Sequence, residues 1–342
     1  MSGIKRYYDD QPSVQNKTTY SIDYRPSLAL TGLSSSLSVI GSLVIFLSFY
    51  KDRVRSFTFR ILVCLTVADF LNAVGNILGV IRYSRFGSSL VITQPSSCDK
   101  DNLCVSQSFI TVVASLSSFW WTFLAALNHL LHYRGSHCLE SRVMWILSHT
   151  VGWGIPLLIA TVALSFDVLG EGFSAGSGPW CWIKDCESIK PSPIFWMLIT
   201  GKAWEIAAYL GIPAIYIVLK CQQYCRYRKN SRFPRISGYQ QSYNSISQQD
   251  HSINQVSHSE DRFGILWIFL YLYVTRVWGS ARFFIFVGHN GSPYLPVVDK
   301  VDKVLMYFQS VGDSAQAFVN FMGFVLLPFL YKCCKQRNNY IL

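Results

Sequence analysis

The sequence predicts an all-α fold: a bundle of seven transmembrane helices, with the N-terminus outside and the C-terminus in the cytoplasm. Of the 342 residues, 51% are hydrophobic and only 14% are charged, whereas soluble proteins carry about 25% charged residues. Seven apolar runs are each long enough to cross ~30 Å of hydrocarbon, which takes about 20 residues. An odd number of spans puts the termini on opposite sides, and Lys and Arg concentrate in the segments that this topology places inside.

The spans follow one another along most of the chain and are expected at about 28–50, 57–81, 105–131, 143–166, 195–219, 263–287 and 304–331. Together they form one domain, 28–331, between a short extracellular segment, 1–27, and a short cytoplasmic tail, 332–342. Segment 226–262 is rich in Ser, Gln and Asn and lacks an apolar face. It is therefore predicted to be a disordered third cytoplasmic loop.

The charge distribution supports this orientation. The inner loops and tail contain sixteen Lys and Arg residues and five acids, the outer segments eleven of each, and the spans three of each. The formal net charge of +11 thus lies on the cytoplasmic face, as in a multi-pass protein of the plasma membrane. A basic surface facing anionic lipid accounts for it, and we expect no nucleic-acid partner. Residues 1–26 lack an apolar core, so no cleaved signal peptide is expected.

Four cysteines fall in the outer segments, and an even number there suits two disulfides. Cys104, at the start of the third span, and Cys181, in "GPWCWIKDC", form the stronger candidate pair. A bridge between them would fix the second outer loop across the mouth of the bundle. Cys98 and Cys186 are the remaining pair.

Other segments carry candidate modification sites. Two N-glycosylation triplets fall outside, at Asn16 and Asn290. Cys333 and Cys334 lie among basic residues at the inner membrane surface, a context typical of palmitoylation. Free structural thiols are the alternative interpretation of these two cysteines.

Six ionisable residues lie within the spans, where a charge in hydrocarbon is costly unless it faces the bundle interior. Counting ~1.5 Å per residue from the outer end of each helix places five of them at depths where they can meet. One interpretation is a set of structural ion pairs. The other is the polar floor of an outward-opening ligand pocket, with a buried polar switch at Asp69 and candidate lining residues Lys202, Glu205, Arg276, Arg282, Asp313, Gln309, Trp120, Trp121, Trp196 and Trp278.

Several classes of protein are disfavoured. His129 and His132 share a helical face, but no third ligand at metal-site spacing accompanies them, so we expect no metal, no cofactor and no catalytic residues. A retinal pigment would need a lysine within the seventh span, and the only one nearby, Lys303, lies at its outer mouth.

Several stretches resemble receptor signatures. "LTVADF" is similar to the second-span pattern of G-protein-coupled receptors, and "GWGIP" is similar to the fourth-span signature of secretin, adhesion and slime-mould cyclic-AMP receptors. "GPWCWIKD", "FWMLITGKAWEIAAYLGIPAIY" and "RVWGSARF" together resemble the orphan G-protein-coupled receptor 157 family, a relative of the cyclic-AMP receptors. The resemblance extends over all seven spans and fades in the N-terminus and the third inner loop.

This resemblance implies a receptor that promotes nucleotide exchange on a heterotrimeric G protein. The chain departs from rhodopsin-like receptors, because its third span ends in "LLHYRG" and its seventh reads "NFMGFVLLPFLY". The rhodopsin-like activation switch therefore does not carry over, although His132, Tyr133 and Arg134 are placed to touch a partner. The N-terminal segment has no cysteine and cannot form a disulfide-bonded hormone-capturing domain, which favours a small extracellular ligand. A nucleotide is one option, since Lys202 and Arg282 could meet a phosphate.

We therefore expect an outer ligand to favour one arrangement of the fifth to seventh helices, which opens their inner ends to the G protein. In the resting bundle we expect Glu205 to pair with Lys202 and Arg276, and Pro213 to mark a kink in the fifth helix. Two alternatives remain at this point. The chain could be a transporter or channel, or a receptor-fold protein that does not couple to G proteins.

Overall fold

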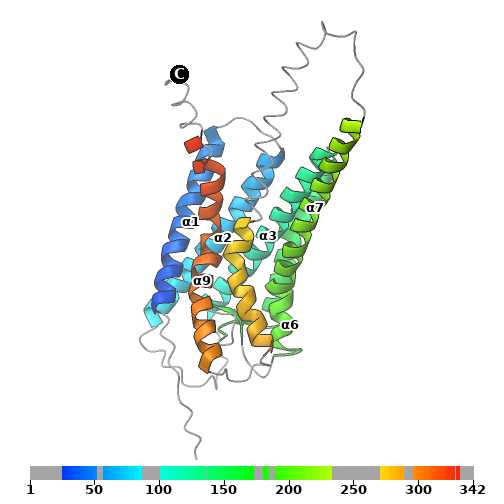
Figure 1. The fold of residues 1–342 in the computed structure, drawn as a ribbon. Helices are drawn as coiled ribbons and strands as arrows, with labels where there is room; N and C mark the ends of the chain where they lie inside the picture. The colour runs from blue at the N-terminus through cyan, green and yellow to red at the C-terminus, as the bar shows by residue number, and fades with distance from the viewer. Residues whose placement is uncertain are drawn as a thin grey trace, which may run out of the picture.

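The computed structural model describes residues 25–51, 57–86, 101–136, 138–172, 180–184, 189–232, 270–288, 296–327 and 329–331. These residues form a bundle of helical spans with a short β-hairpin at one end (Figure 1). We call the end with the hairpin the outer end and the opposite end the inner end. The predicted all-α seven-helix fold is confirmed.

The first three spans are single helices: α1 (Arg25–Lys51), α2 (Phe57–Phe86) and α3 (Asn102–Tyr133). The fourth begins after the short helix η1 (Cys138–Glu140) and consists of α4 (Arg142–His149), the π-helical turn η2 (Thr150–Gly154) and α5 (Ile155–Ser165). The fifth consists of α6 (Pro193–Met197), the π-helical turn η3 (Leu198–Lys202) and α7 (Ala203–Arg232). Residues 270–288 form the sixth span, and α9 (Pro296–Phe321) with the π-helical turn η4 (Met322–Leu326) forms the seventh.

Six of these helical segments are long and apolar enough to cross a membrane by length and composition. The helix at 270–288, which carries Arg276 and Arg282, completes the seven. Most helices extend beyond the predicted spans. In particular, α7 continues past Pro213 to Arg232, so residues 226–232 are helical where we expected a disordered loop. The remainder of that loop, residues 233–262, lies outside the described residues.

The outward faces of the helices are apolar, as lipid contact requires. Leu33, Leu47, Leu158 and Leu210 are between 63% and 71% exposed, a degree of exposure that suits hydrocarbon as the surrounding solvent.

Small and hydroxylated residues bring neighbouring spans together. Along α1, the hydroxyls of Ser34 and Ser38 donate to backbone carbonyls of α9, at Ser310 and Ser314, and the two helices lie side by side (Figure 1). At Gly312 of α9, an added Cβ would lie 2.0 Å from the Thr275 carbonyl oxygen of the sixth span. Close backbone approach at small residues is the usual way in which helices associate in membranes.

The outer hairpin consists of β1 (Leu169–Gly170) and β2 (Trp182–Ile183), paired antiparallel. The predicted disulfide between Cys104 and Cys181 is confirmed and ties the hairpin to the start of α3. Gln107 of α3 adds a second attachment, because its Oε1 accepts from the Cys181 backbone N–H at 2.8 Å. The hairpin is therefore held over the outer end of the bundle.

The outer loops are also held by charge. Arg82 of α2 donates to Asp101, the N-cap residue of α3, and to Glu171, which follows β1. Asp101 in turn accepts from the backbone N–H of Leu103 at 2.9 Å. This cluster links α2, α3 and the hairpin segment.

Candidate ligand-binding site

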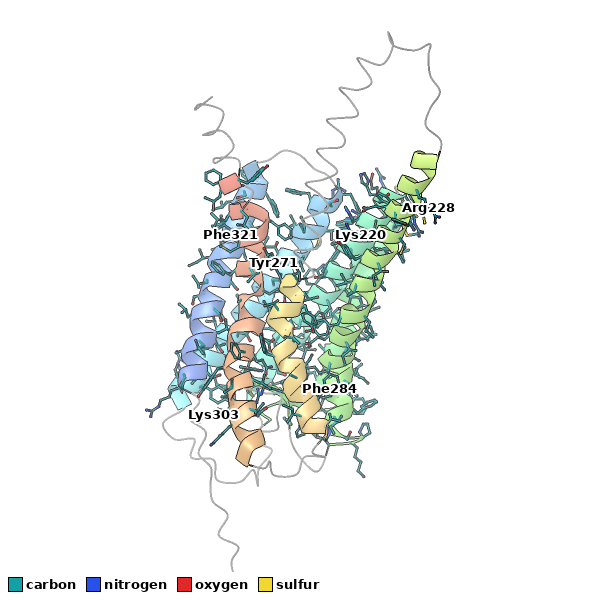
Figure 2. The ribbon with its side chains drawn as sticks, in the orientation of Figure 1. Lys220, Arg228, Tyr271, Phe284, Lys303 and Phe321 are labelled. Carbon is teal, nitrogen blue, oxygen red and sulfur yellow. A yellow bond between two sulfur atoms is a disulfide. The ribbon has the colours of Figure 1, made fainter. Side chains whose placement is uncertain are left out.

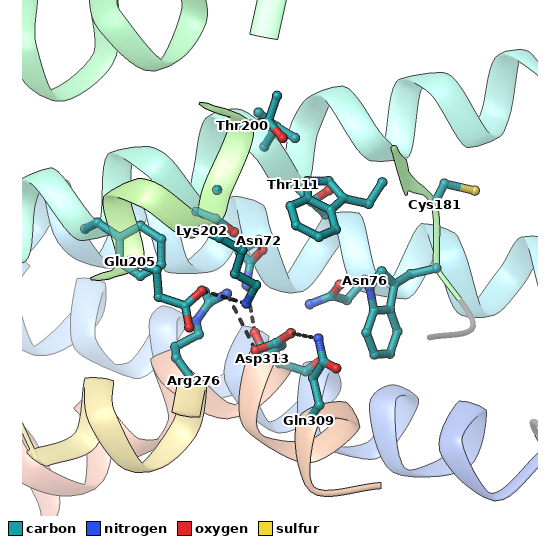
Figure 3. Close-up of a pocket in the computed structure, with 17 residues that line it drawn as sticks. Asn72, Asn76, Thr111, Cys181, Thr200, Lys202, Glu205, Arg276, Gln309 and Asp313 are labelled. Atoms are coloured by element: carbon teal, nitrogen blue, oxygen red, sulfur yellow. Dashed lines mark hydrogen bonds and ion pairs between the residues drawn. The ribbon is translucent and has the colours of Figure 1, made fainter. Parts of the chain in front are cut away.

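A cavity of about 80 Å³ lies among the spans beneath the hairpin (Figure 3). We call it the outer cavity. Trp180, Cys181 and Trp182 line it from the hairpin segment, and its other lining residues come from α2, α3, the fifth span, the sixth span and α9. Five of the predicted pocket residues line it: Lys202, Glu205, Arg276, Gln309 and Asp313.

Lys202 and Glu205 form a buried ion pair on one side of the cavity. Their Nζ and Oε2 atoms are 2.8 Å apart, and each residue is no more than 6% exposed. Glu205 Oε1 accepts from Tyr209 Oη at 2.8 Å and from Ser280 Oγ of the sixth span. Lys202 is the last residue of η3, and π-helical turns are frequent at functional sites.

Arg276 pairs differently from our expectation. Its nearest acid is Asp313, with 3.8 Å between Nη1 and Oδ1, and not Glu205. Its Nε donates to Gln316 Oε1 at 3.1 Å, while Asp313 accepts from Gln309 Nε2 at 2.9 Å. Figure 3 shows Arg276, Asp313 and Gln309 gathered at one side of the cavity. The expected pair of Lys202 with Glu205 forms, and the expected pair of Arg276 with Glu205 was wrong.

Two lining donors are left without a partner. Arg276 Nη2 and Asn76 Nδ2 are buried, and neither has a hydrogen-bond acceptor within the part of the chain that the structure describes. An unsatisfied buried donor is costly. Ser35 Oγ, Ser117 Oγ and Trp121 Nε1 are unsatisfied elsewhere in the described part of the bundle, so what distinguishes these two donors is their position on the cavity wall.

Arg282 does not line the cavity. Its Nε and Nη2 donate to the two carboxylate oxygens of Asp302, each at 2.9 Å, and its Nη1 donates to Gln309 Oε1 at 2.8 Å. Its guanidinium fixes the outer ends of the sixth and seventh spans. The structure therefore does not bring Arg282 and Lys202 together around the cavity as a phosphate site would require.

The four predicted tryptophans lie elsewhere in the bundle. Trp196 belongs to the outer apolar core, Trp120 packs against Trp204, and Trp278 stacks on Phe308. Trp121 is fully buried and packs against aromatic rings of the fourth span, at Trp145, His149 and Trp153. Depth along a helix did not reveal which way these side chains point.

Several lining residues were not predicted. Trp180 and Trp182 flank Cys181, so the predicted disulfide could have placed them over the mouth. Asn72, Asn76 and Ser115 are neutral polar residues of α2 and α3, and a search restricted to ionisable groups passes over them.

Asp69 is the centre of a second polar cluster, adjoining the cavity. Its Oδ1 accepts from Ser118 Oγ and its Oδ2 from Asn320 Nδ2, each at 2.7 Å. Gln316 Nε2 donates to Ser118 Oγ at 2.9 Å. We call these four residues, Asp69, Ser118, Gln316 and Asn320, the Asp69 network. Because Gln316 also accepts from Arg276, the network is continuous with the cavity.

The predicted G-protein-facing residues lie at the inner end of α3. His132 and Tyr133 end the helix, and Arg134 follows and hydrogen-bonds the side-chain amide of Gln222 of α7. Lys220 and Arg228 of α7 lie toward the same end, opposite Lys303 (Figure 2). A role for these residues in binding a G protein stays a prediction.

Other predicted sites lie outside the described residues: Asn16, Cys98, Cys186, Asn290, Cys333 and Cys334. Among the residues that the structure does describe, no group of three or more His, Cys, Asp or Glu side chains is placed to hold a metal ion.

Comparison with known proteins places the chain among receptors. A family model described as "7 transmembrane receptor (Secretin family)" matches residues 27–230. "G-protein coupled receptor 157" of Homo sapiens is 31% identical over 304 residues, which cover 87% of this chain and 79% of the human protein. The Rattus norvegicus protein of the same name is 30% identical over 323 residues, covering 90% and 86%.

Two more distant similarities are consistent with this. "Cyclic AMP receptor-like protein A" of Dictyostelium discoideum is 26% identical over 157 residues, which cover 46% of this chain and 36% of that protein. The crystal structure of squid rhodopsin has a TM-score of 0.60 at 12% identity, covering 97% of this chain and 92% of rhodopsin, and it supports the fold alone. The family match and the human and rat similarities show that this chain belongs to the secretin-type seven-transmembrane receptors, in the G-protein coupled receptor 157 family.

Proposed function

We propose that this chain is a plasma-membrane receptor that transmits the binding of a small extracellular ligand to a heterotrimeric G protein. The ligand occupies the outer cavity, and the fifth to seventh spans rearrange so that the inner end accepts the G protein. The ligand shifts this equilibrium only by its differential affinity for the two arrangements.

One observation carries the proposal. Hydrogen bonds run from cavity-lining Arg276 through Gln316 to Ser118, and on to Asp69 and Asn320. This route links the sixth span to α9, α3 and α2. A ligand that moves Arg276 therefore changes contacts in four spans, which is how an outer site can bias the arrangement of the inner end.

Reporters for each class of heterotrimeric G protein, expressed with the full chain beside an ion and solute flux assay, test the proposal. We expect basal or ligand-evoked exchange on at least one class. We also expect Gln316→Leu to change that exchange while surface expression is retained, because it interrupts the hydrogen-bonded route.

Two outcomes would contradict the proposal. Flux without exchange would identify a transporter or channel. If neither exchange nor flux is seen at normal surface expression, with every class of G protein present, the chain is a receptor-fold protein that does not couple to G proteins.

A further inference from the structure

The lining of the outer cavity includes buried donor groups that lack an acceptor among the described residues. On the acceptor side, Glu205 receives three hydrogen bonds, from Lys202, Tyr209 and Ser280. Asp313 receives one from Gln309 and faces Arg276 as an ion pair. Glu205 is therefore close to saturated, whereas Asp313 accepts one hydrogen bond and has its cation 3.8 Å away.

On the donor side, bonding capacity remains. Arg276 Nη2 and Asn76 Nδ2 have no acceptor in the described part of the chain, although each residue is only 6% exposed. Lys202 Nζ carries three protons and makes one hydrogen bond, to Glu205. A ligand that satisfies these buried donors must therefore supply acceptors. A cationic ligand would leave both donors unsatisfied and would meet two buried cations.

The charges of the lining residues limit the charge that a ligand can carry. Lys202 and Arg276 balance Glu205 and Asp313, so the lining charges sum to zero. A single negative charge can be held by charge-assisted bonds from Arg276, which are about twice as strong as neutral ones. A dianion would bring two charges close to both carboxylates, where like charges repel in a low-dielectric interior.

The volume of the cavity limits the size of the ligand. A cavity needs about 10–15 Å³ to hold one water, so a cavity of about 80 Å³ holds roughly five to eight non-hydrogen atoms of similar size. A nucleotide is far larger. The non-polar part of a small ligand has an aromatic wall available, from Phe119, Trp180 and Trp182.

We propose that the outer cavity binds a small monocarboxylate of about three to five carbons, on the size limit above. Its carboxylate accepts from Arg276 and Asn76, and its short carbon chain packs against the aromatic wall. This inference rests on the proposed function in taking the cavity as the receptor's ligand site, but binding itself can be measured without a G protein.

Thermal unfolding of the purified full chain in lipid nanodiscs tests the inference. Butyrate is compared with butyramide, which has the same shape without the charge, with butylamine, and with potassium chloride at equal ionic strength. We expect butyrate to raise Tm in proportion to the logarithm of its concentration once it exceeds Kd, by on the order of 5 °C at one hundred times its Kd, and the other three to leave Tm unchanged.

Three variants test the assignment of residues. Arg276→Gln should weaken butyrate binding by about 100-fold and Asn76→Ala by about 10-fold, as losses of a charged bond and of one further bond. Asn76→Ala also serves if Arg276→Gln does not fold. Arg85→Gln, which removes an exposed cation near the outer end and away from the cavity, should bind butyrate like the unaltered chain.

The inference is overturned if butyramide stabilises the chain as well as butyrate does, or if propionate, butyrate and valerate all leave Tm unchanged. Equal weakening by Asn76→Ala and Arg85→Gln would also overturn it. Carboxylate binding without nucleotide exchange on any G protein would instead remove the proposed function. Nucleotide exchange without carboxylate binding would be consistent with the proposed function and would exclude small monocarboxylates as the ligand.

Discussion

The outer cavity and the Asp69 network are adjoining buried polar clusters that differ in how their charges are satisfied. In the cavity, two cations face two acids while two donor groups keep unused hydrogen-bonding capacity. In the Asp69 network, a single acid, 2% exposed, is held by a neutral hydroxyl and a neutral amide, one on each oxygen. The cavity can therefore take up a ligand, whereas the network is suited to hold helices together.

The two clusters also differ in what a substitution leaves behind. Removing one member of a buried ion pair strands the opposite charge, which costs several kcal/mol. Removing one member of a neutral hydrogen bond costs the desolvation of the group that remains, about 1–3 kcal/mol. Substitutions that break an ion pair of the cavity should therefore destabilise the fold more than substitutions in the Asp69 network do.

The largest effect is expected from Lys202→Met, which leaves Glu205 buried without its cation. We expect the free energy of unfolding to fall by about 3–5 kcal/mol, and Glu205→Gln in the same chain to restore part of it by removing the stranded charge. Thermal unfolding in nanodiscs measures both. Lys184→Met is the matched control, because Lys184 is equally buried but its partner, Asp167, has a half-exposed side chain. Equal losses of unfolding free energy for the two lysine variants would show that burial of the acidic partner does not increase the cost of losing the lysine.

An intermediate effect is expected where the two clusters meet. Gln316→Leu removes the acceptor of Arg276 Nε and the donor to Ser118, so we expect a loss of about 2–3 kcal/mol of unfolding free energy. Thr66→Val is the control, since the Thr66 hydroxyl donates to the Leu62 backbone carbonyl of its own helix. If Gln316→Leu and Thr66→Val destabilise equally, the bridge between the clusters contributes nothing beyond an ordinary hydrogen bond.

A smaller effect is expected from Asp69→Asn. The substituted amide keeps an acceptor for Ser118, and the Asn320 amide can turn to accept from the new donor, so a loss of about 1 kcal/mol follows. Thermal unfolding again provides the measurement. A loss as large as that of Lys202→Met would mean that the charge of Asp69 is paired as tightly as the charges of the cavity.

The sequence predicts the fold and part of the site for identifiable physical reasons. Apolar length and the positions of Lys and Arg predict the bundle, because hydrocarbon thickness sets span length. Helical rise brings Lys202, Glu205, Arg276 and Asp313 to similar depths. Depth leaves rotation about the helix axis open, however, and for this reason it did not reveal that Arg282 and the four tryptophans do not line the outer cavity. The π-helical turn η3, which ends at Lys202, interrupts the regular helical period that sequence counting assumes.

The smallest effect is expected at the outer loops, where the charges are closer to water. Burial alone would raise the pKa of Asp101, but hydrogen bonds from Arg82 and from the backbone N–H groups of α3 outweigh it, so the pKa lies below its ordinary value. A carboxyl whose pKa is lowered by folding stabilises the fold above its unfolded pKa, about 3.9, and loses that contribution as the pH falls through the folded value.

Asp101→Asn keeps the N-cap of α3 and removes the charge together with the carboxylate oxygen that accepts from Arg82. Since the Asp101 side chain is 36% exposed, water screens the pair with Arg82 and the variant should lose at most about 1 kcal/mol at pH 7. The difference in Tm between the two proteins should shrink as the pH falls below about 4, because the unaltered chain then loses the same charge. A difference that stays constant down to pH 3 would mean that the charge of Asp101 contributes nothing and that the variant loses only the acceptor for Arg82, so that the ion pairs that matter for stability are those buried around the cavity.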